Sequence, residues 1–171
     1  MSHPVNPQLT FVLGGARSGK SRYAESLLAR HAAPWTYIAT AEAHDEEMRA
    51  RIAEHRRRRG EGWRTREAPL ALSTALAEDA APALVDCLTL WLSNVMLGER
   101  DPGGECDALL AALARRSAPT VVVSNEVGQG IVPDNALARR FRDAAGVLHQ
   151  RVAAVAGHVV WMVAGLPVVA K

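Results

Sequence analysis

Residues Gly14–Ser21 constrain the fold of this chain more than any other segment, because their sequence, GGARSGKS, fits the pattern G-x-x-x-x-G-K-[ST] without a gap. The apolar run Leu9–Leu13 precedes this motif, and a segment with a helical pattern, Ser21–Arg30, follows it. Between a strand and a helix, the glycines let successive backbone N–H groups point at phosphate oxygens. Lys20 then reaches the β- and γ-phosphates, and the Ser21 hydroxyl ligates Mg²⁺. The sequence therefore predicts a P-loop that binds a nucleoside triphosphate.

Short apolar runs recur along the chain and alternate with helical patterns. The runs are Trp35–Ala39, Ala83–Cys87, Thr120–Ser124 and His158–Val163. They are typical of strands covered on both faces and predict a mostly parallel sheet flanked by helices. Val168-Val169, after the turn Gly165-Leu166-Pro167, predicts an antiparallel C-terminal edge strand. We therefore expect an α/β P-loop NTPase (RecA-like) fold, with a flexible lead-in at residues 1–8 and a single catalytic domain at 9–171.

Two helices and one loop are also predicted. Leu88–Leu97 has a helical pattern, and a longer helix runs from Asp134, its expected cap, to about Ala156. The apolar residues of the longer helix recur at three- and four-residue steps, which predicts a buried stripe. This stripe comprises Leu137, Phe141, Ala145, Leu148, Val152 and Val155. Asp101-Pro102-Gly103-Gly104 predicts a loop.

Composition indicates an ordinary globular protein, with 49% hydrophobic and 22% charged residues. The net charge of +2 is too small to indicate a nucleic-acid partner by itself, although eight arginines fall between Arg49 and Arg66. Cys87 and Cys106 lack the spacing of metal ligands, and Cys87 is expected to be buried. The sequence shows no signal peptide and no run of about 18 apolar residues, so we expect a cytoplasmic protein.

An acidic residue closes one of the expected strands. Asp86 follows the apolar run Ala83-Leu84-Val85. At this end of a buried strand, P-loop proteins place the acid that holds Mg²⁺ or its bound water. The alternative role is the N-cap of the helix at Leu88–Leu97. Given the P-loop, we favour a magnesium site formed by Ser21 and Asp86.

The segment Glu42–Arg59 is the second unusual feature. On one helix, its residues Met48, Ile52, His55 and Arg59 share a face at four-, three- and four-residue steps. Positive charge from Arg51, Arg56, Arg58 and Arg59 keeps such an imidazole neutral, so its lone pair is free to attack phosphorus. The arginines would stabilise the transition state. Spacing alone favours an ordinary exposed histidine on a solvated basic helix, and a nucleic-acid patch is a further alternative.

A shaped loop follows the run Thr120–Ser124. Its sequence, Asn125–Pro133, contains two glycines and a proline and lies at the carboxyl edge of the expected sheet, where ligands bind in open α/β folds. It is not the guanine-reading N-K-x-D motif, because the lysine and the aspartate are missing. Glu126 is either a site residue or a turn-stabilising one.

Taken together, these segments resemble the bifunctional adenosylcobinamide kinase/adenosylcobinamide-phosphate guanylyltransferase family of cobalamin biosynthesis. The matching pieces, in order, are Gly14–Ser21, Tyr37–Thr40, the Glu46/Met48/Arg51-Ile52 pattern leading to His55, Trp63–Thr65 with Glu67, Asp86–Thr89, Asn125–Pro133, and Phe141–Asp143 with Gly146. The P-loop is shared by many families, whereas the N-E-V-G-x-G-I-V-P run combined with the histidine and its arginines is far more specific. The resemblance covers nearly the whole chain, and His149 stands where asparagine is commoner in such sequences.

The resemblance implies two reactions, phosphorylation of adenosylcobinamide by ATP or GTP and transfer of GMP from GTP onto the product, with release of pyrophosphate. It implies that His55 is guanylylated as an intermediate, with Lys20 and Ser21 as the other catalytic residues. The implied nucleotide contacts are Gly14, Gly15, Ala16, Arg17, Ser18, Gly19, Lys20, Ser21, Ala39, Thr40, Ala41, Arg56, Arg57, Arg58, Arg59, Glu67 and Thr89. Glu67 would accept from the guanine N1/N2 edge. The resemblance also implies a homotrimer.

Three rival functions remain open at this point. The chain could keep only one of the two activities, act as a nucleic-acid-associated NTPase through its arginine-rich helix, or be a regulatory nucleotide-binding module. An aromatic content of 5% and the slight net charge argue against nucleic acid. Lys20, Ser21 and Asp86 argue against a purely regulatory module, since binding alone needs no metal-positioning acid. We expect no nucleic-acid partner and no membrane insertion.

Overall fold

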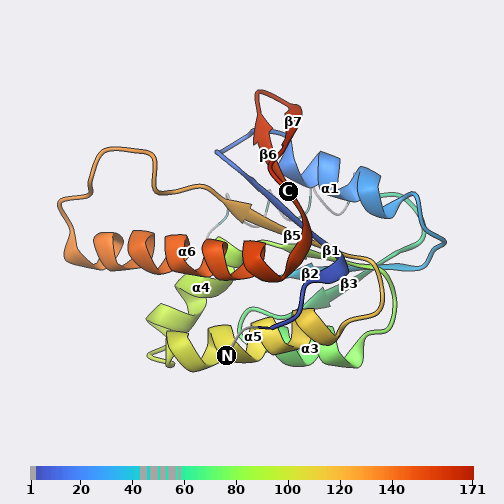
Figure 1. Ribbon diagram of the computed structural model, residues 1–171, viewed down its shortest axis with the longest axis horizontal. Coiled ribbons are helices and arrows are strands. Elements are labelled where there is room, and N and C mark those ends of the chain that lie inside the picture. Colours follow the sequence, from blue (N-terminus) through green and yellow to red (C-terminus); the bar gives the residue numbers. More distant parts are fainter. Residues whose placement is uncertain (1–2, 43–45, 47–49, 51–52, 54–56, 58) are drawn as a thin grey trace.

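A single seven-stranded sheet organises the part of the chain that the structure describes. The structure is a computed structural model, and it describes residues 3–42, 46, 50, 53, 57 and 59–171. The strands are β1 (Asn6–Gly14), β2 (Trp35–Ala39), β3 (Trp63–Glu67), β4 (Ala83–Asp86), β5 (Thr120–Asn125), β6 (Ala156–Val163) and β7 (Leu166–Val169). Their order in the sheet is β3-β2-β4-β5-β1-β6-β7, and all neighbours run parallel except β6 and β7 (Figure 1). The predicted α/β class and the antiparallel C-terminal strand are confirmed.

Helices cover both faces of this sheet (Figure 1). They are α1 (Lys20–Leu28), α3 (Leu72–Glu78), α4 (Leu88–Leu97), α5 (Pro102–Arg115) and α6 (Ala136–Val155). Successive residues of β1 point to opposite faces, so Phe11 packs in the cluster under α3, α4, α5 and α6, while Val12 packs against α1. Burial on both faces explains why the inner strands are nearly continuous apolar runs. Among the described residues, none of the helices has the length and apolar character needed to span a membrane.

The strand register brings residues from distant parts of the sequence to one edge of the sheet. Ala39 of β2 lies between Glu67 of β3 and Asp86 of β4. Next to β4 lies β5, and Asn125 at its end pairs with Gly14 at the end of β1. The carboxyl ends of five parallel strands therefore present these residues along one continuous edge.

Two strand predictions were incomplete. β1 begins at Asn6, so residues 6–8 belong to the sheet although we expected them in the lead-in. The Asn6 side chain is buried and donates to the carbonyl oxygens of Leu113 (2.7 Å) and Arg116 (2.9 Å), which holds the start of the strand. β3 was not predicted as a strand, because its sequence, WRTRE, lies at the sheet edge with its side chains mostly exposed and therefore has no apolar run.

Three helix predictions were wrong in detail. Asn135 caps α6, because its side chain accepts from the backbone N–H groups of Leu137 and Ala138; Asp134 lies one residue too early. Leu137 is 43% exposed and does not belong to the buried stripe. The segment 101–104 is a helix start instead of a loop, because the Asp101 carboxylate accepts from two backbone N–H groups and Pro102 is tolerated in the first turn. The helix Leu88–Leu97 is confirmed.

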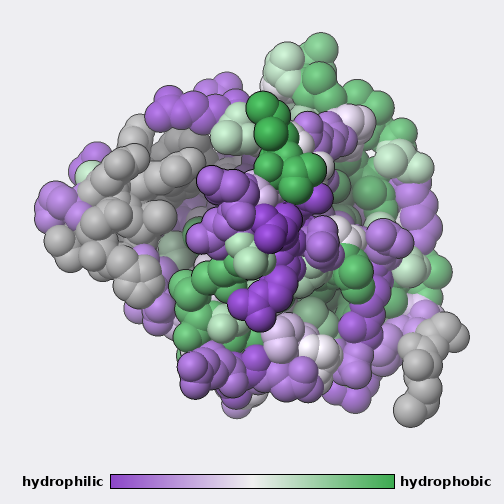
Figure 2. All heavy atoms as spheres, turned by 90° about the vertical axis from the view of Figure 1, so that its left-hand side faces the viewer, coloured by the Kyte–Doolittle hydropathy of each residue, from purple (hydrophilic) through white to green (hydrophobic). Residues whose placement is uncertain are grey.

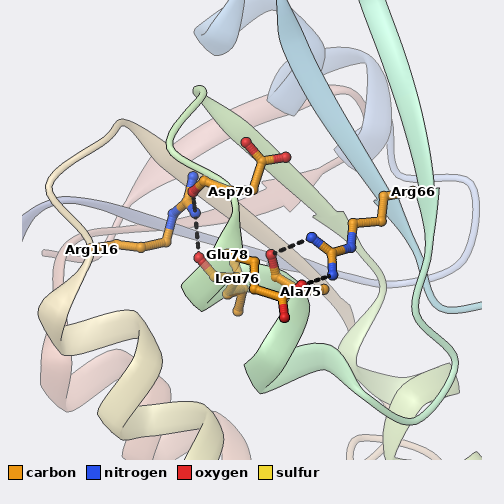
Figure 3. Close-up of polar contacts among 6 residues, drawn as sticks. All are labelled: Arg66, Ala75, Leu76, Glu78, Asp79 and Arg116. Atoms are coloured by element: carbon orange, nitrogen blue, oxygen red, sulfur yellow. Dashed lines mark hydrogen bonds and ion pairs between the residues drawn. The ribbon is translucent and has the colours of Figure 1, made fainter.

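A buried arginine ties α3 to the amino ends of the central strands (Figure 3). The Arg116 guanidinium donates to the carbonyl oxygens of Leu76 (2.6 Å), Asp79 and Ala81 (2.5 Å) and to the Thr120 hydroxyl (2.7 Å). These carbonyls lie at or just beyond the C-terminal end of α3, where a positive charge is favourable. The network stabilises the amino ends of β4 and β5, which lie at the opposite end of the strands from the P-loop.

Candidate active site

Two of the P-loop glycines are required by the backbone geometry. Gly14 ends β1, and a Cβ atom there would lie 2.7 Å from the Met162 carbonyl oxygen and 2.8 Å from Ser18 Oγ. Gly19 precedes α1 with φ of 90°, a conformation that residues with a Cβ rarely adopt. The turn between β6 and β7 supports the loop, since the Gly165 N–H donates to the Ser18 carbonyl (3.1 Å). The motif therefore has the close-packed turn that a phosphate cradle needs.

Lys20 places its charge inside this turn. Its side chain is buried, and Nζ donates to the Gly15 carbonyl oxygen (2.6 Å) and lies 3.4 Å from Ser18 Oγ. The ammonium is thus held over the loop whose N–H groups face a bound phosphate in P-loop proteins. A phosphate oxygen is a stronger acceptor for this cation than a neutral carbonyl, so a triphosphate can replace these contacts.

The structure brings Ser21 and Asp86 together. Ser21 Oγ, in the first turn of α1, donates to Asp86 Oδ2 over 2.9 Å, although β5 lies between the strands β1 and β4. Asp86 does not cap α4, because Cys87 occupies the N-cap position and makes no side-chain cap bond. A hydroxyl and a carboxylate are the hard oxygen donors that Mg²⁺ binds together with phosphate oxygens and waters, so this pair fits the metal.

Tyr37 is a member of this site that the sequence reasoning missed. Its hydroxyl donates to the same oxygen, Asp86 Oδ2, over 3.0 Å. Burial, reinforced by the Asp86 charge, raises the pKa of the Tyr37 phenol far above its usual value, and the Arg59 charge only partly opposes this shift. The phenol therefore stays protonated and remains a donor. A tyrosine in the middle of a buried strand was a usable signal, since its hydroxyl needs a partner.

Arg59 connects the arginine-rich segment to this cluster. Its guanidinium carbon lies 3.3 Å from the centroid of the Tyr37 ring, a cation–π contact. The positive charge is therefore held beside the tyrosine that supports Asp86. Arg57 is helical and exposed, whereas His55, Arg56 and Arg58 lie outside the described residues.

The side chains of Thr40 and Thr89 point inward. Thr40 Oγ1 donates to the Cys87 carbonyl (2.7 Å) and accepts from the Cys87 N–H (2.8 Å), which fixes the backbone next to Asp86. Thr89 Oγ1 accepts from Asn125 Nδ2 (3.0 Å). Ala39 and Ala41 flank Thr40 at the same edge and offer only their backbone groups. Glu67 is exposed at the carboxyl end of β3, next to Ala39 in register. The nucleotide contacts expected of these residues stay predictions.

The loop after β5 is joined directly to the P-loop strand. The Glu126 N–H donates to the Gly14 carbonyl over 2.9 Å, and Glu126 Oε1 accepts from the Gly128 N–H (2.5 Å). The structure thus supports the turn-stabilising role of Glu126. Just before it, Ser124 Oγ lies 2.8 Å from Nε2 of the buried His149. Burial lowers the pKa of His149, against the opposing effect of the Glu126 charge, so the imidazole is neutral at neutral pH.

Comparisons with known proteins find relatives along nearly the whole chain. The family model for cobinamide kinase/cobinamide phosphate guanyltransferase matches residues 10–170. The bifunctional adenosylcobalamin biosynthesis protein CobP of Pseudomonas aeruginosa is 51% identical over 166 residues, covering 94% of this chain and 95% of the relative. The bifunctional adenosylcobalamin biosynthesis protein CobU of Salmonella typhimurium is 43% identical over 181 residues, covering 95% of this chain and 99% of the relative.

Proposed function

The chain belongs to the cobinamide kinase/cobinamide phosphate guanyltransferase family, and on this premise we propose how its residues carry out the two reactions. The protein is a bifunctional enzyme of cobalamin biosynthesis: it phosphorylates cobinamide and transfers a guanylyl group to cobinamide phosphate. The family predicted from the sequence motifs is therefore confirmed. Membership decides against the nucleic-acid-associated NTPase, the regulatory module and the single-activity enzyme.

We propose that the P-loop handles the triphosphate together with Mg²⁺. The observation that carries this proposal is the 2.9 Å contact between Ser21 Oγ and Asp86 Oδ2 beside the Lys20 ammonium. Lys20 binds the β- and γ-phosphates of ATP or GTP, while Ser21 and Asp86 hold the metal. When bound, Mg²⁺ neutralises charge that develops on the phosphates.

For the second reaction we propose the covalent route through His55. The imidazole nitrogen attacks the α-phosphorus of GTP and pyrophosphate leaves; an oxygen of cobinamide phosphate then attacks the same phosphorus and displaces the imidazole. Arg59 supports this assignment, because it places the end of the arginine-rich segment beside Tyr37 and Asp86. Arg56, Arg57 and Arg58 neutralise the triphosphate, Glu67 accepts from the guanine edge, and Ala39, Thr40, Ala41 and Thr89 line the nucleotide.

We further propose a cytoplasmic homo-oligomer, a trimer by the resemblance described above. The support is the β6–β7 hairpin, whose apolar side chains Leu166 (68% exposed) and Val169 (73% exposed) lie on an edge strand. Figure 2 shows green apolar residues gathered at the top of the molecule, where Figure 1 places this hairpin. An exposed apolar edge of this kind is typical of a protein interface. Light scattering on the purified protein measures the number of subunits.

The covalent route is tested by incubating the enzyme with α-labelled GTP and then denaturing it. A phosphoramidate on histidine is labile in acid and stable in alkali, and we expect label with that behaviour on the wild type and none on His55→Ala. His31→Ala is the matched control, because His31 is exposed and lies outside the site. Label retained in His55→Ala, together with undiminished GMP transfer, would contradict the assignment.

Lys20→Ala should slow the step that uses the P-loop; unchanged rates in both reactions would contradict its role.

A further inference from the structure

Two adjacent apolar side chains are exposed in the loop between β5 and α6. Ile131 is 97% exposed and Val132 is 59% exposed, whereas Val127 in the same segment, residues 126–135, packs against the core. Single exposed apolar residues are common on protein surfaces and need no explanation. The position and the support of this pair make it unusual.

Both ends of the 126–135 loop are anchored. At its start, Glu126 bonds to Gly14 through its N–H and to the Gly128 N–H through its side chain. At its end, Arg139 Nη1 donates to the carbonyl oxygens of Pro133 (2.9 Å) and Asp134 (2.6 Å). The apolar pair is therefore presented on a loop that is already shaped, which lowers the entropy cost of binding a ligand there.

The loop also lies next to the phosphate site. It leaves the carboxyl end of β5 beside Gly14, the first residue of the P-loop, and extends outward before the chain returns as α6 (Figure 1). That side of the molecule faces the viewer in Figure 2, where green residues stand among purple ones. A molecule that contacts this loop can therefore reach a phosphate bound at the P-loop.

The chemistry of the loop does not suit a nucleotide phosphate. Residues 127–133, with the sequence VGQGIVP, carry no ionisable side chain, while Lys20 supplies the charge of the P-loop. Both reactions have a second substrate, the corrinoid, which is a broad macrocycle with methyl groups and uncharged amide side chains at its rim. We propose that the 126–135 loop binds the corrinoid, with Ile131 and Val132 packing against the macrocycle and the exposed Gln129 amide bonding to its amides. This inference rests on the proposed function, because the corrinoid must reach the phosphates at the P-loop.

The test is the variant Ile131→Ser/Val132→Ser, with Leu97→Ser as the matched control, since Leu97 is 66% exposed at the far end of α4. Removing two apolar contacts should raise the KM for cobinamide about tenfold. The KM for the nucleotide and the labelling by GTP without corrinoid should not change. Equilibrium dialysis with cobinamide alone should show the same loss of affinity in the double variant. The conservative variant Ile131→Leu, with Val132 intact, should bind cobinamide as the wild type does.

Each other outcome overturns the inference. An unchanged KM for cobinamide and unchanged dialysis show that the loop does not contact the corrinoid. A change in the mass measured by light scattering, with the KM values for both substrates altered, shows that a second copy of the chain covers the loop. A wild type that binds and labels with GTP but never turns over cobinamide refutes the proposed function itself, and this inference with it.

Discussion

The hydroxyl of Tyr37 provides the sharpest test of the site geometry. Asp86 Oδ2 accepts two hydrogen bonds, from Ser21 over 2.9 Å and from Tyr37 over 3.0 Å. Tyr37→Phe removes the second bond and keeps the ring beneath Arg59, while Asp86 Oδ2 still accepts from Ser21. A hydrogen bond to a charged group contributes about 1.5–3 kcal/mol, and the lower part of that range corresponds to a loss of about 10- to 30-fold in kcat/KM.

Magnesium titration of both reactions measures this effect. We expect Tyr37→Phe to need more Mg²⁺ for half-maximal rate in the kinase reaction. Among the residues that the structure describes, the Asp86 carboxylate then keeps only its hydrogen bond from Ser21. The free energy of unfolding in urea should fall by about 1.5 kcal/mol, the lower end of that range, because Asp86 Oδ2 still accepts from Ser21. Tyr23→Phe is the matched control. Tyr23 is the other of the two tyrosines and packs against the hydrophobic cluster that contains the Tyr37 ring. A wild-type rate and magnesium dependence in Tyr37→Phe would refute the positioning role of the hydroxyl.

Two further predictions concern stability. Arg116→Met leaves the carbonyl groups at the end of α3 without their donor, so the free energy of unfolding in urea should fall by about 3 kcal/mol; a loss below about 1 kcal/mol would contradict this. Burial lowers the pKa of His149, so as the pH falls below about 6.5 the unfolded chain binds a proton that the folded chain does not, and stability decreases. His149→Gln should therefore lose less stability than the wild type between pH 7 and pH 5.5 in urea unfolding, and an equal loss in the two proteins would count against the assignment.

Local patterns in the sequence determined a large part of this protein. The P-loop is contiguous, and its chemistry follows from the glycines, Lys20 and Ser21 in one short segment. The inner strands were predictable because burial on both faces requires continuous apolar runs. β3 was not predicted, because an edge strand with exposed side chains does not have a continuous apolar run. Its register nevertheless places Glu67 beside Ala39.

The sequence also identified Asp86 as a candidate, but its partners came from the tertiary structure alone. Ser21 and Tyr37 lie 65 and 49 residues from Asp86 and meet one carboxylate oxygen. The inward direction of Thr40 and Thr89 was equally invisible, because a hydroxyl bonds whichever group the fold places within reach. Sequence patterns report the surroundings of each segment, apolar or polar, helical or extended. Which side chains from separate segments touch depends on strand order and register, and these are decided only when the whole sheet packs.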